Sequence, residues 1–247
     1  FSSLFVDQAD SLQIRQLQPI AFLISTIVIF VSAREITNDN YSAKWSSILF
    51  FLLPLSSFYS QFATTDAWLL MFWSLSLYFF IKAVKQDEMK WWFACGTSVG
   101  FGLLTKYSML FFLFSSFLYL ISTKQLGSKR PWFAFLIAIL VFSPNLIWNL
   151  HNDFPTLYHH ADMTNVNNTL LLDFNLVLEF FLGQFVVFGP LIFLLFLYLS
   201  ILSMKKVIYK YKENSQLISK KPTSILFLFF SWPILVSMIA LSFFGET

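Results

Sequence analysis

Nearly all of the positive charge in this chain lies in short clusters that separate long apolar runs. Of the 16 Lys and Arg residues, 14 fall into four clusters: Arg34 and Lys44; Lys82, Lys85 and Lys90; Lys124, Lys129 and Arg130; and six lysines between residues 205 and 221. Lys and Arg beside transmembrane helices mark the cytoplasmic side of a membrane. The pattern therefore predicts an integral, multi-pass membrane protein with all four clusters on the cytoplasmic side.

The composition agrees with this class. Apolar residues make up 57% of the chain, charged residues only 12%, and the mean hydropathy is +0.68. A soluble domain is about 25% charged. The single cysteine, Cys95, excludes a disulfide framework and a Cys-rich metal site. The net charge of +3 is distributed as a membrane protein requires, so we expect membrane lipids and no nucleic acid as partners.

Eight apolar runs alternate with the polar segments. Two of them form a pair divided only by Thr105 and Lys106, and a run of 14 residues gives about 21 Å of helix against a hydrocarbon core of about 30 Å. We therefore predict an all-α bundle of about eight membrane helices, two of them short. The runs are residues 17–33, 46–59, 67–81, 91–104, 107–122, 131–150, 176–202 and 224–244.

Two cations lie on the opposite, outer side of this pattern. They are Arg15 and Lys106. Lys106 stands alone between two short apolar runs, where a cation is costly unless it has a partner or a function. Two interpretations remain open: Lys106 faces protein or a cavity and contacts a charged group, or it reaches the interface from an ordinary helical turn.

Asp66 stands directly before an apolar run that enters from the outer side. Thr64, Thr65 or Asp66 could each cap this helix, and a carboxylate there complements the helix dipole. The same carboxylate could instead bind a metal, orient an acceptor or hold a cationic partner. The spacing leaves both interpretations open.

The predicted outer loop carries further polar residues. Because neighbouring side chains point in different directions, its histidines are interpreted as ordinary loop residues, with no metal site assigned and a divalent cation left open as a cofactor. Asn145 and Asn149 lie four residues apart on one helical face, which we assign to the acceptor side. The loop residues are His151, His159 and His160, with Asp153 and Asp162.

Several segments, taken in order, resemble the membrane region of glycosyltransferase family 39. That family includes the dolichyl-phosphate-mannose protein mannosyltransferases and the bacterial lipid A aminoarabinose transferases. The resemblance covers roughly residues 1–200 and is carried by TTDAWLLMFWSLSLYFFIKAV, GTSVGFGLLTKYSMLFF, FSPNLIWNLHNDFPTLYHHADMTN and FLGQFVVFGPLIFLLFL.

The resemblance implies a GT-C fold with its active site at the external membrane face, in a bacterium the periplasmic side of the inner membrane. The donor would be a sugar on a polyprenyl phosphate, and the acceptor a lipid, a glycan or a protein. Asp66 matches the acidic residue after the third transmembrane helix of the family, which makes it the catalytic-site carboxylate, in a positioning role. Lys106 matches the Lys of a Thr-Lys-Gly-like turn, with Tyr107 replacing the usual Gly.

Substrate binding is assigned to residues around this position. Arg15 matches an Arg that follows an amphipathic segment of the family's first external loop. The assigned substrate-binding residues are Lys106, Arg15, Tyr107, His151 and Asn149.

The resemblance also implies an incomplete chain. Residues 1–247 would form a single transmembrane GT-C-like domain that lacks the family's first helix and first external loop, and also a C-terminal region. The family's catalytic base lies in that loop, while Asp7 and Asp10 match its later part. The chain by itself is therefore expected to be inactive.

Two alternatives remain. A transporter or lipid flippase would share the apolar spans and the lone cation, although the halves of the chain show no internal inverted repeat. A catalytically inactive transferase remnant is the other alternative.

Overall fold

The computed structural model describes residues 8–53, 64–155, 174–213 and 223–242, which form helices joined by turns in two compact units. The first unit contains the chain up to Leu110 together with Ser128–Phe142. The second contains Phe111–Gly127 and the chain from Ser143 onward. The expectation of one domain over residues 1–247 stays a prediction.

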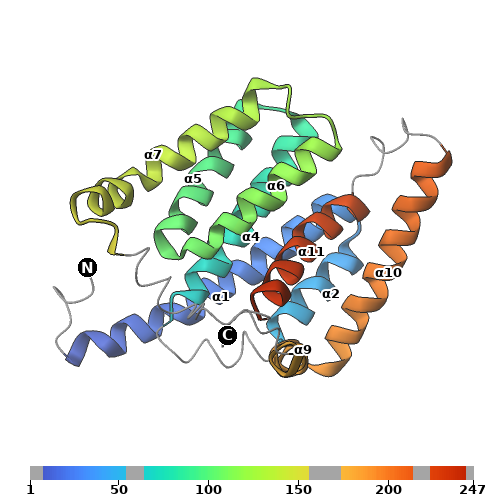
Figure 1. Cartoon of the computed structure of the whole chain (residues 1–247), viewed down its shortest axis with the longest axis horizontal. Coiled ribbons are helices and arrows are strands. Elements are labelled where there is room, and N and C mark those ends of the chain that lie inside the picture. The colour runs from blue at the N-terminus through green and yellow to red at the C-terminus, as the bar shows by residue number, and fades with distance from the viewer. Residues whose placement is uncertain (1–7, 54–63, 156–173, 214–222, 243–247) are drawn as a thin grey trace. The chain divides into compact units, whose positions relative to one another are not determined.

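The helices of the first unit come from the chain before Leu110 and from the start of α7 (Figure 1). They are α1 (Gln8–Thr37), α2 (Asn40–Phe51), α4 (Asp66–Gln86), α5 (Met89–Thr105), the 3-10 turn η2 (Tyr107–Met109) and the first part of α7 (Lys129–His151). The second unit contains the rest of α7, with α6 (Leu110–Ser122), α9 (Phe174–Phe188), α10 (Pro190–Glu213) and α11 (Thr223–Ser242).

The predicted class, an all-helical membrane bundle, is confirmed. The described residues contain no strand. Among the described residues, four helical segments are long and apolar enough to cross a membrane: Leu17–Thr37, Asp66–Gln86, Lys129–His151 and Pro190–Ile208. Three shorter apolar helices accompany them, at Tyr107–Ser122, Leu178–Phe188 and Ile225–Ser237.

Helices α4 and α5 pack side by side in opposite directions through the first unit. Their contacts follow each other at intervals of about one helical turn, which is how antiparallel helices meet. These contacts are Phe80 on Trp92, with ring centroids 6.2 Å apart, the Cys95 Sγ near the Ser76 carbonyl oxygen at 3.7 Å, and Phe72 stacked on Phe101 at 5.7 Å.

Helix α1 lies against α4 and runs in the same direction. Near their N-terminal ends, a buried cluster joins Ala21 and Phe22 of α1 to Ala67 and Met71 of α4. Near their C-terminal ends, Glu35 pairs with Lys82. Residues at the start of α1's apolar segment therefore lie at the level of the start of α4.

Glycine brings α5 close to the first half of α7, which runs beside it (Figure 1). A Cβ added at Gly96 would overlap the carbonyl oxygen of Ala134, and one at Gly100 would lie 2.5 Å from the Cβ of Val141. Two glycines four residues apart allow the backbones of membrane helices to approach closely. The contact therefore depends on the absence of side chains at both positions.

The predicted apolar run over residues 176–202 is two helices. Helix α9 ends at Phe188, and α10 begins at Pro190. Between them Gly189 has a φ of 78°. Proline disfavours a helical conformation in the residue before it, and glycine adopts positive φ without a Cβ penalty. Hydropathy alone could not reveal the break, because apolar residues stand directly on both sides of Gly189 and Pro190.

Aromatic packing holds the second unit together. Phe193 of α10 is 1% exposed and meets Phe181 and Phe185 of α9, with ring centroids 5.4 and 5.0 Å apart. On α11, Phe230 packs edge-on against Phe112 of α6 at 5.2 Å. These rings supply a large buried apolar area at four helices of this unit.

Candidate active site

Charged residues in the first unit gather at two ends. At one end, Glu35 of α1 accepts from Lys82 of α4, with the Nζ and Oε2 atoms 2.6 Å apart, and also pairs with Lys85. Arg130 of α7 pairs with Asp87, the residue that ends α4 in the left-handed conformation. Lysines of the second basic cluster and Arg130 of the third thus lie at the same end of the unit.

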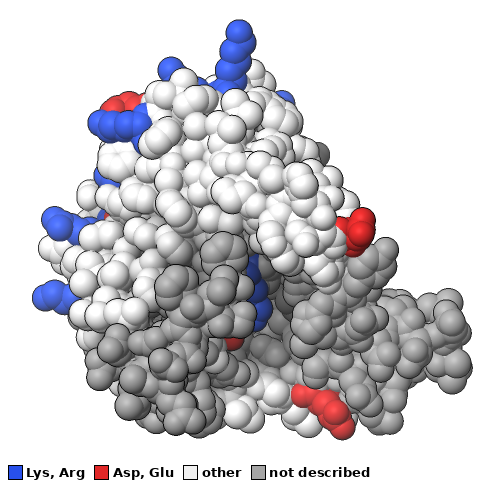
Figure 2. Space-filling view, turned by 90° about the vertical axis from the view of Figure 1, so that its left-hand side faces the viewer, with Lys and Arg blue, Asp and Glu red and all other residues white. Residues whose placement is uncertain are grey.

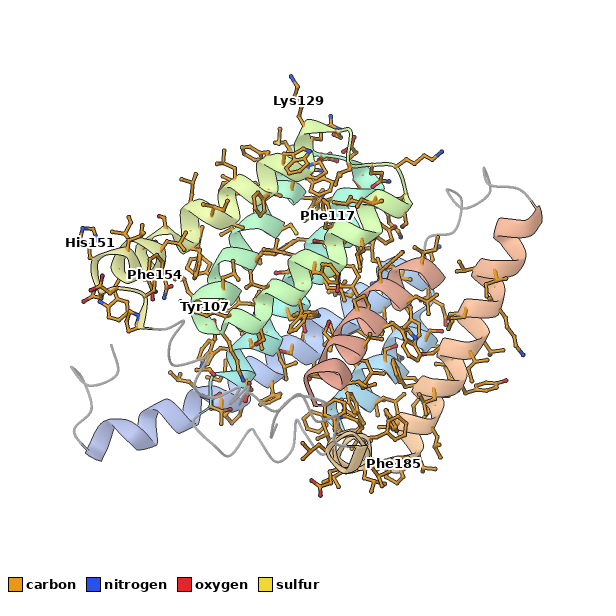
Figure 3. All side chains as sticks on the ribbon, in the orientation of Figure 1. Tyr107, Phe117, Lys129, His151, Phe154 and Phe185 are labelled. Carbon is orange, nitrogen blue, oxygen red and sulfur yellow. The ribbon has the colours of Figure 1, made fainter. Side chains whose placement is uncertain are left out.

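The other end carries Lys106 and Asp66. Figure 3 shows the labelled Lys129 at one end of this unit and Tyr107, the neighbour of Lys106, at the other. In the face drawn in Figure 2, most Lys and Arg side chains lie along the top and the left-hand edge, some with acidic residues beside them. Helix α4 has 21 residues, so about 30 Å separates its two ends.

Lys106 and Asp66 form an ion pair between α5 and α4. The Lys106 Nζ lies 2.7 Å from the Asp66 Oδ1. The side chains are 44% and 33% exposed, so each retains access to solvent or to a ligand. The two predicted site residues lie 40 positions apart in sequence, and the antiparallel packing of α4 and α5 brings them together.

The end of α5 explains why Lys106 points at α4. The helix ends at Thr105, Lys106 is extended with φ −158° and ψ 135°, and the turn Tyr107–Met109 follows. The predicted break at residues 105–106 is confirmed. The extended residue turns the lysine side chain out of the helix, toward the N-terminus of α4.

Asp66 does not act as the helix cap. Thr65 occupies the N-cap position, and its side chain makes no capping hydrogen bond. Asp66 is the first helical residue, where its charge complements the α4 dipole while its carboxylate pairs with Lys106. Since Asp66 is not the N-cap, its carboxylate is free of a capping role and serves as the electrostatic partner of Lys106 at this end of the unit.

Tyr107 follows Lys106 and packs inside the first unit. Its ring meets Phe142 of α7 edge-on, with the centroids 5.8 Å apart. This contact anchors the turn that presents Lys106. Arg15 lies in α1, and its side chain is outside the described part of the structure.

The other two assigned residues, Asn149 and His151, belong to the second unit. Asn149 is 3% exposed, and its amide nitrogen donates to the carbonyl and side-chain oxygens of Asn145 at 3.0 and 3.1 Å. The two asparagines therefore share a helical face, as predicted. His151 is exposed at the end of α7, with its Nδ1 2.8 Å from the Ile147 carbonyl oxygen.

Residues 156–173, which include His159, His160 and Asp162, fall outside the described residues. Among the residues that are described, no three His, Cys, Asp or Glu side chains gather as metal ligands.

Gln18 is a buried polar residue that the sequence reasoning missed. It is 2% exposed, and its Oε1 has no hydrogen-bond partner in the described structure. The signal was the last of several glutamines that precede the apolar residues of this run. It is weak, because such a residue more often marks the membrane interface.

Comparison with known proteins gives a family match. The profile of the family described as dolichyl-phosphate-mannose-protein mannosyltransferase matches residues 1–148. The lipid A galacturonosyltransferase RgtD of Rhizobium johnstonii is 30% identical over 182 residues, which cover 73% of this chain and 38% of that protein.

The lipopolysaccharide core galacturonosyltransferase RgtB of the same organism is 26% identical over 148 residues, 57% of this chain and 30% of that protein. The chain thus spans roughly a third of the length of these relatives. No solved structure matches the chain significantly.

Proposed function

Because the chain belongs to the dolichyl-phosphate-mannose-protein mannosyltransferase family of membrane glycosyltransferases, we propose that it transfers a sugar from a polyprenyl-phosphate donor to a lipid, glycan or protein acceptor. The observation that carries this proposal is the half-exposed Lys106–Asp66 pair, at the end of the first unit opposite its basic clusters. We place the reaction at the external face of the membrane, in a bacterium the periplasmic face of the inner membrane.

Lys106 supplies hydrogen-bond donors and a positive charge for the leaving phosphate. A lysine ammonium has three donors, and one points at Asp66, so two remain for phosphate oxygens. As the acceptor oxygen bonds to the anomeric carbon, the bond from that carbon to the phosphate oxygen breaks, and the phosphate leaves with the electron pair. A fixed cation beside it stabilises the developing charge.

Asp66 has a positioning role in this mechanism. Its carboxylate already accepts from Lys106, so it holds the ammonium in place between the two helices. The proton of the acceptor hydroxyl needs a separate base. We do not assign that role to Asp66.

The relatives favour one acceptor class. Both are named galacturonosyltransferases, one acting on lipid A and one on the lipopolysaccharide core. We therefore propose a saccharolipid of the cell envelope as acceptor and a galacturonic acid donor as the first substrate to try.

The test is a transfer assay on the full-length protein in membranes. Lys106→Ala should lower kcat/KM for the lipid-linked donor by at least about 100-fold, the effect of removing a donor that stabilises transition-state charge. Lys82→Ala is the matched control, since it removes the lysine of another ion pair at the opposite end of α4. An unchanged donor KM and turnover in Lys106→Ala would overturn the assignment.

A further inference from the structure

Three buried polar atoms without partners accompany the Lys106–Asp66 pair. They are the Oε1 of Gln18, the Oγ1 of Thr64 and the Oγ of Ser108, none of which has a hydrogen-bond partner in the part of the chain that the structure describes. Thr64 precedes Asp66 by two residues, and Ser108 follows Lys106 by two. Buried polar atoms are nearly always hydrogen-bonded, so three at one end need an explanation.

Gln18 reaches this end through the packing of α1 on α4. It lies one helical turn before Ala21 and Phe22, on the α1 face that forms a buried cluster with Ala67 of α4. Since α1 and α4 run in the same direction, Gln18 is at the level of the residues that precede Ala67, which include Thr64. It is the most deeply buried of the three, at 2% exposure.

The chemistry of these atoms indicates the missing partner. A glutamine Oε1 only accepts hydrogen bonds, whereas hydroxyl groups donate and accept. An ionised phosphodiester has no proton to donate, so it cannot satisfy the Gln18 Oε1. A sugar hydroxyl can satisfy this oxygen and the Thr64 and Ser108 hydroxyls alike.

We propose that Gln18, with Thr64 and Ser108, binds the sugar hydroxyls of the lipid-linked donor, beside the phosphate held by Lys106. The proposal rests on the proposed function, because it takes Lys106 as the phosphate partner. Two sets of residues then bind the donor. Lys106 binds the phosphate, which all polyprenyl-phosphate donors share, and the three neutral side chains bind the sugar, which differs between donors.

The experiment compares two probes on the full-length protein in nanodiscs. One is polyprenyl phosphate, and the other is the same lipid carrying galacturonic acid. Gln18→Met replaces the amide by an apolar side chain of similar length. It should weaken binding of the sugar-bearing probe about five- to tenfold, the value of one neutral hydrogen bond, and leave binding of polyprenyl phosphate unchanged.

A second readout separates binding from structure. Gln18→Met removes a buried acceptor that is unpaired without ligand, so the thermal midpoint of the unliganded protein should rise. Ser76→Ala is the matched control: Ser76 is also fully buried with an unpaired Oγ, but it lies in the middle of α4. This variant should affect neither probe.

The outcomes are distinct. An equal loss for both probes in Gln18→Met, or a loss for neither, would overturn the sugar site. Thr64→Val and Ser108→Ala should likewise weaken binding of the sugar-bearing probe alone. These two variants test the sugar site if Gln18→Met does not fold. Lys106→Ala should weaken both probes. If it weakens neither, the phosphate assignment fails, while the comparison between probes in Gln18→Met still decides the sugar site.

Discussion

At the scale of single residues, the Lys106–Asp66 pair is better suited to function than to stability. Both side chains are at least a third exposed. Exposed ion pairs contribute about 0–1 kcal/mol, because solvent screens the attraction and ordering two side chains costs entropy. A pair that adds so little to stability fits a positioning role, in which Asp66 holds the Lys106 ammonium while its other N–H groups meet an incoming phosphate.

This argument predicts a small coupling energy in stability. Asp66→Asn, Lys106→Met and the double variant should give a coupling below about 1 kcal/mol in unfolding of the detergent-solubilised protein. Asp66→Asn should nevertheless reduce donor turnover, because the ammonium loses its fixed position. A coupling of several kcal/mol would instead identify the pair as a structural element of the bundle.

A second residue-level prediction concerns pH and the start of α2. The Ser42 hydroxyl donates to the Asp39 carboxylate at 2.6 Å, and the backbone N–H groups of Ser42 and Tyr41 donate at 2.8 and 3.1 Å. These hydrogen bonds hold the pKa of Asp39 below its usual value. The ionised cap therefore stabilises the folded state above about pH 4, and the effect disappears as pH falls through the lowered pKa.

The measurement is the thermal midpoint of Asp39→Ala against the unaltered protein from neutral to acidic pH. The variant should have the lower midpoint at pH 7, and the difference should shrink below about pH 4. A difference that is constant over this range would show that the charge of Asp39 does not contribute.

At the scale of elements, the α5–α7 contact decides how the first unit packs. Gly96 and Gly100 let α5 approach the backbone of α7 at Ala134 and Ala138. Any added side chain must displace backbone or the Val141 side chain. Since Lys106 lies at the end of α5, this packing also sets the direction from which the lysine meets α4.

Substitution at these glycines should therefore be costly. Gly96→Leu and Gly100→Leu should each destabilise the protein by about 1–3 kcal/mol or more, the usual range for overpacking, as measured by unfolding in detergent. Gly183→Ala in α9 is the control, because an added Cβ there meets nothing within 4 Å. It should stabilise by about 0.5–1 kcal/mol through lower backbone entropy in the unfolded chain. If both leucine variants are as stable as the unaltered protein, the close contact between α5 and α7 does not contribute to stability.

At the scale of the whole molecule, charge predicts the orientation in the membrane. The basic clusters of the first unit meet at one end, and the Lys106–Asp66 pair lies at the other. Because clusters of Lys and Arg beside membrane helices lie on the cytoplasmic side, we expect the ion pair to lie on the external side. A polyprenyl-linked sugar presented on the external leaflet would reach it without crossing the bilayer.

Cysteine labelling tests this orientation. In the full-length protein without other cysteines, Thr65→Cys should react with a membrane-impermeant maleimide added to intact spheroplasts. Gly127→Cys, in the turn between α6 and α7, should react only after permeabilisation. Both positions are exposed. The reverse pattern would place the proposed site on the cytoplasmic side and remove the basis for an external donor.

Much of this organisation could be predicted from the sequence, because it depends on local composition. Apolar runs must be helical in lipid to satisfy their backbone hydrogen bonds, and the basic clusters separate those runs. The break at Thr105 and Lys106 was predicted for the same reason. The division between α9 and α10 was not, because Gly189 and Pro190 interrupt a run without changing its hydropathy.

The candidate site shows what the sequence could not predict. The sequence by itself identified Asp66 and Lys106 as charged residues at the ends of apolar segments, and it gave no sign of a role for Gln18. Only the tertiary structure decided that Asp66 and Lys106 pair and that Gln18 lies at the same level, buried and unsatisfied. The physical reason is that hydropathy places each residue along its own helix, whereas the packing of α1, α4 and α5 decides which residues meet between helices.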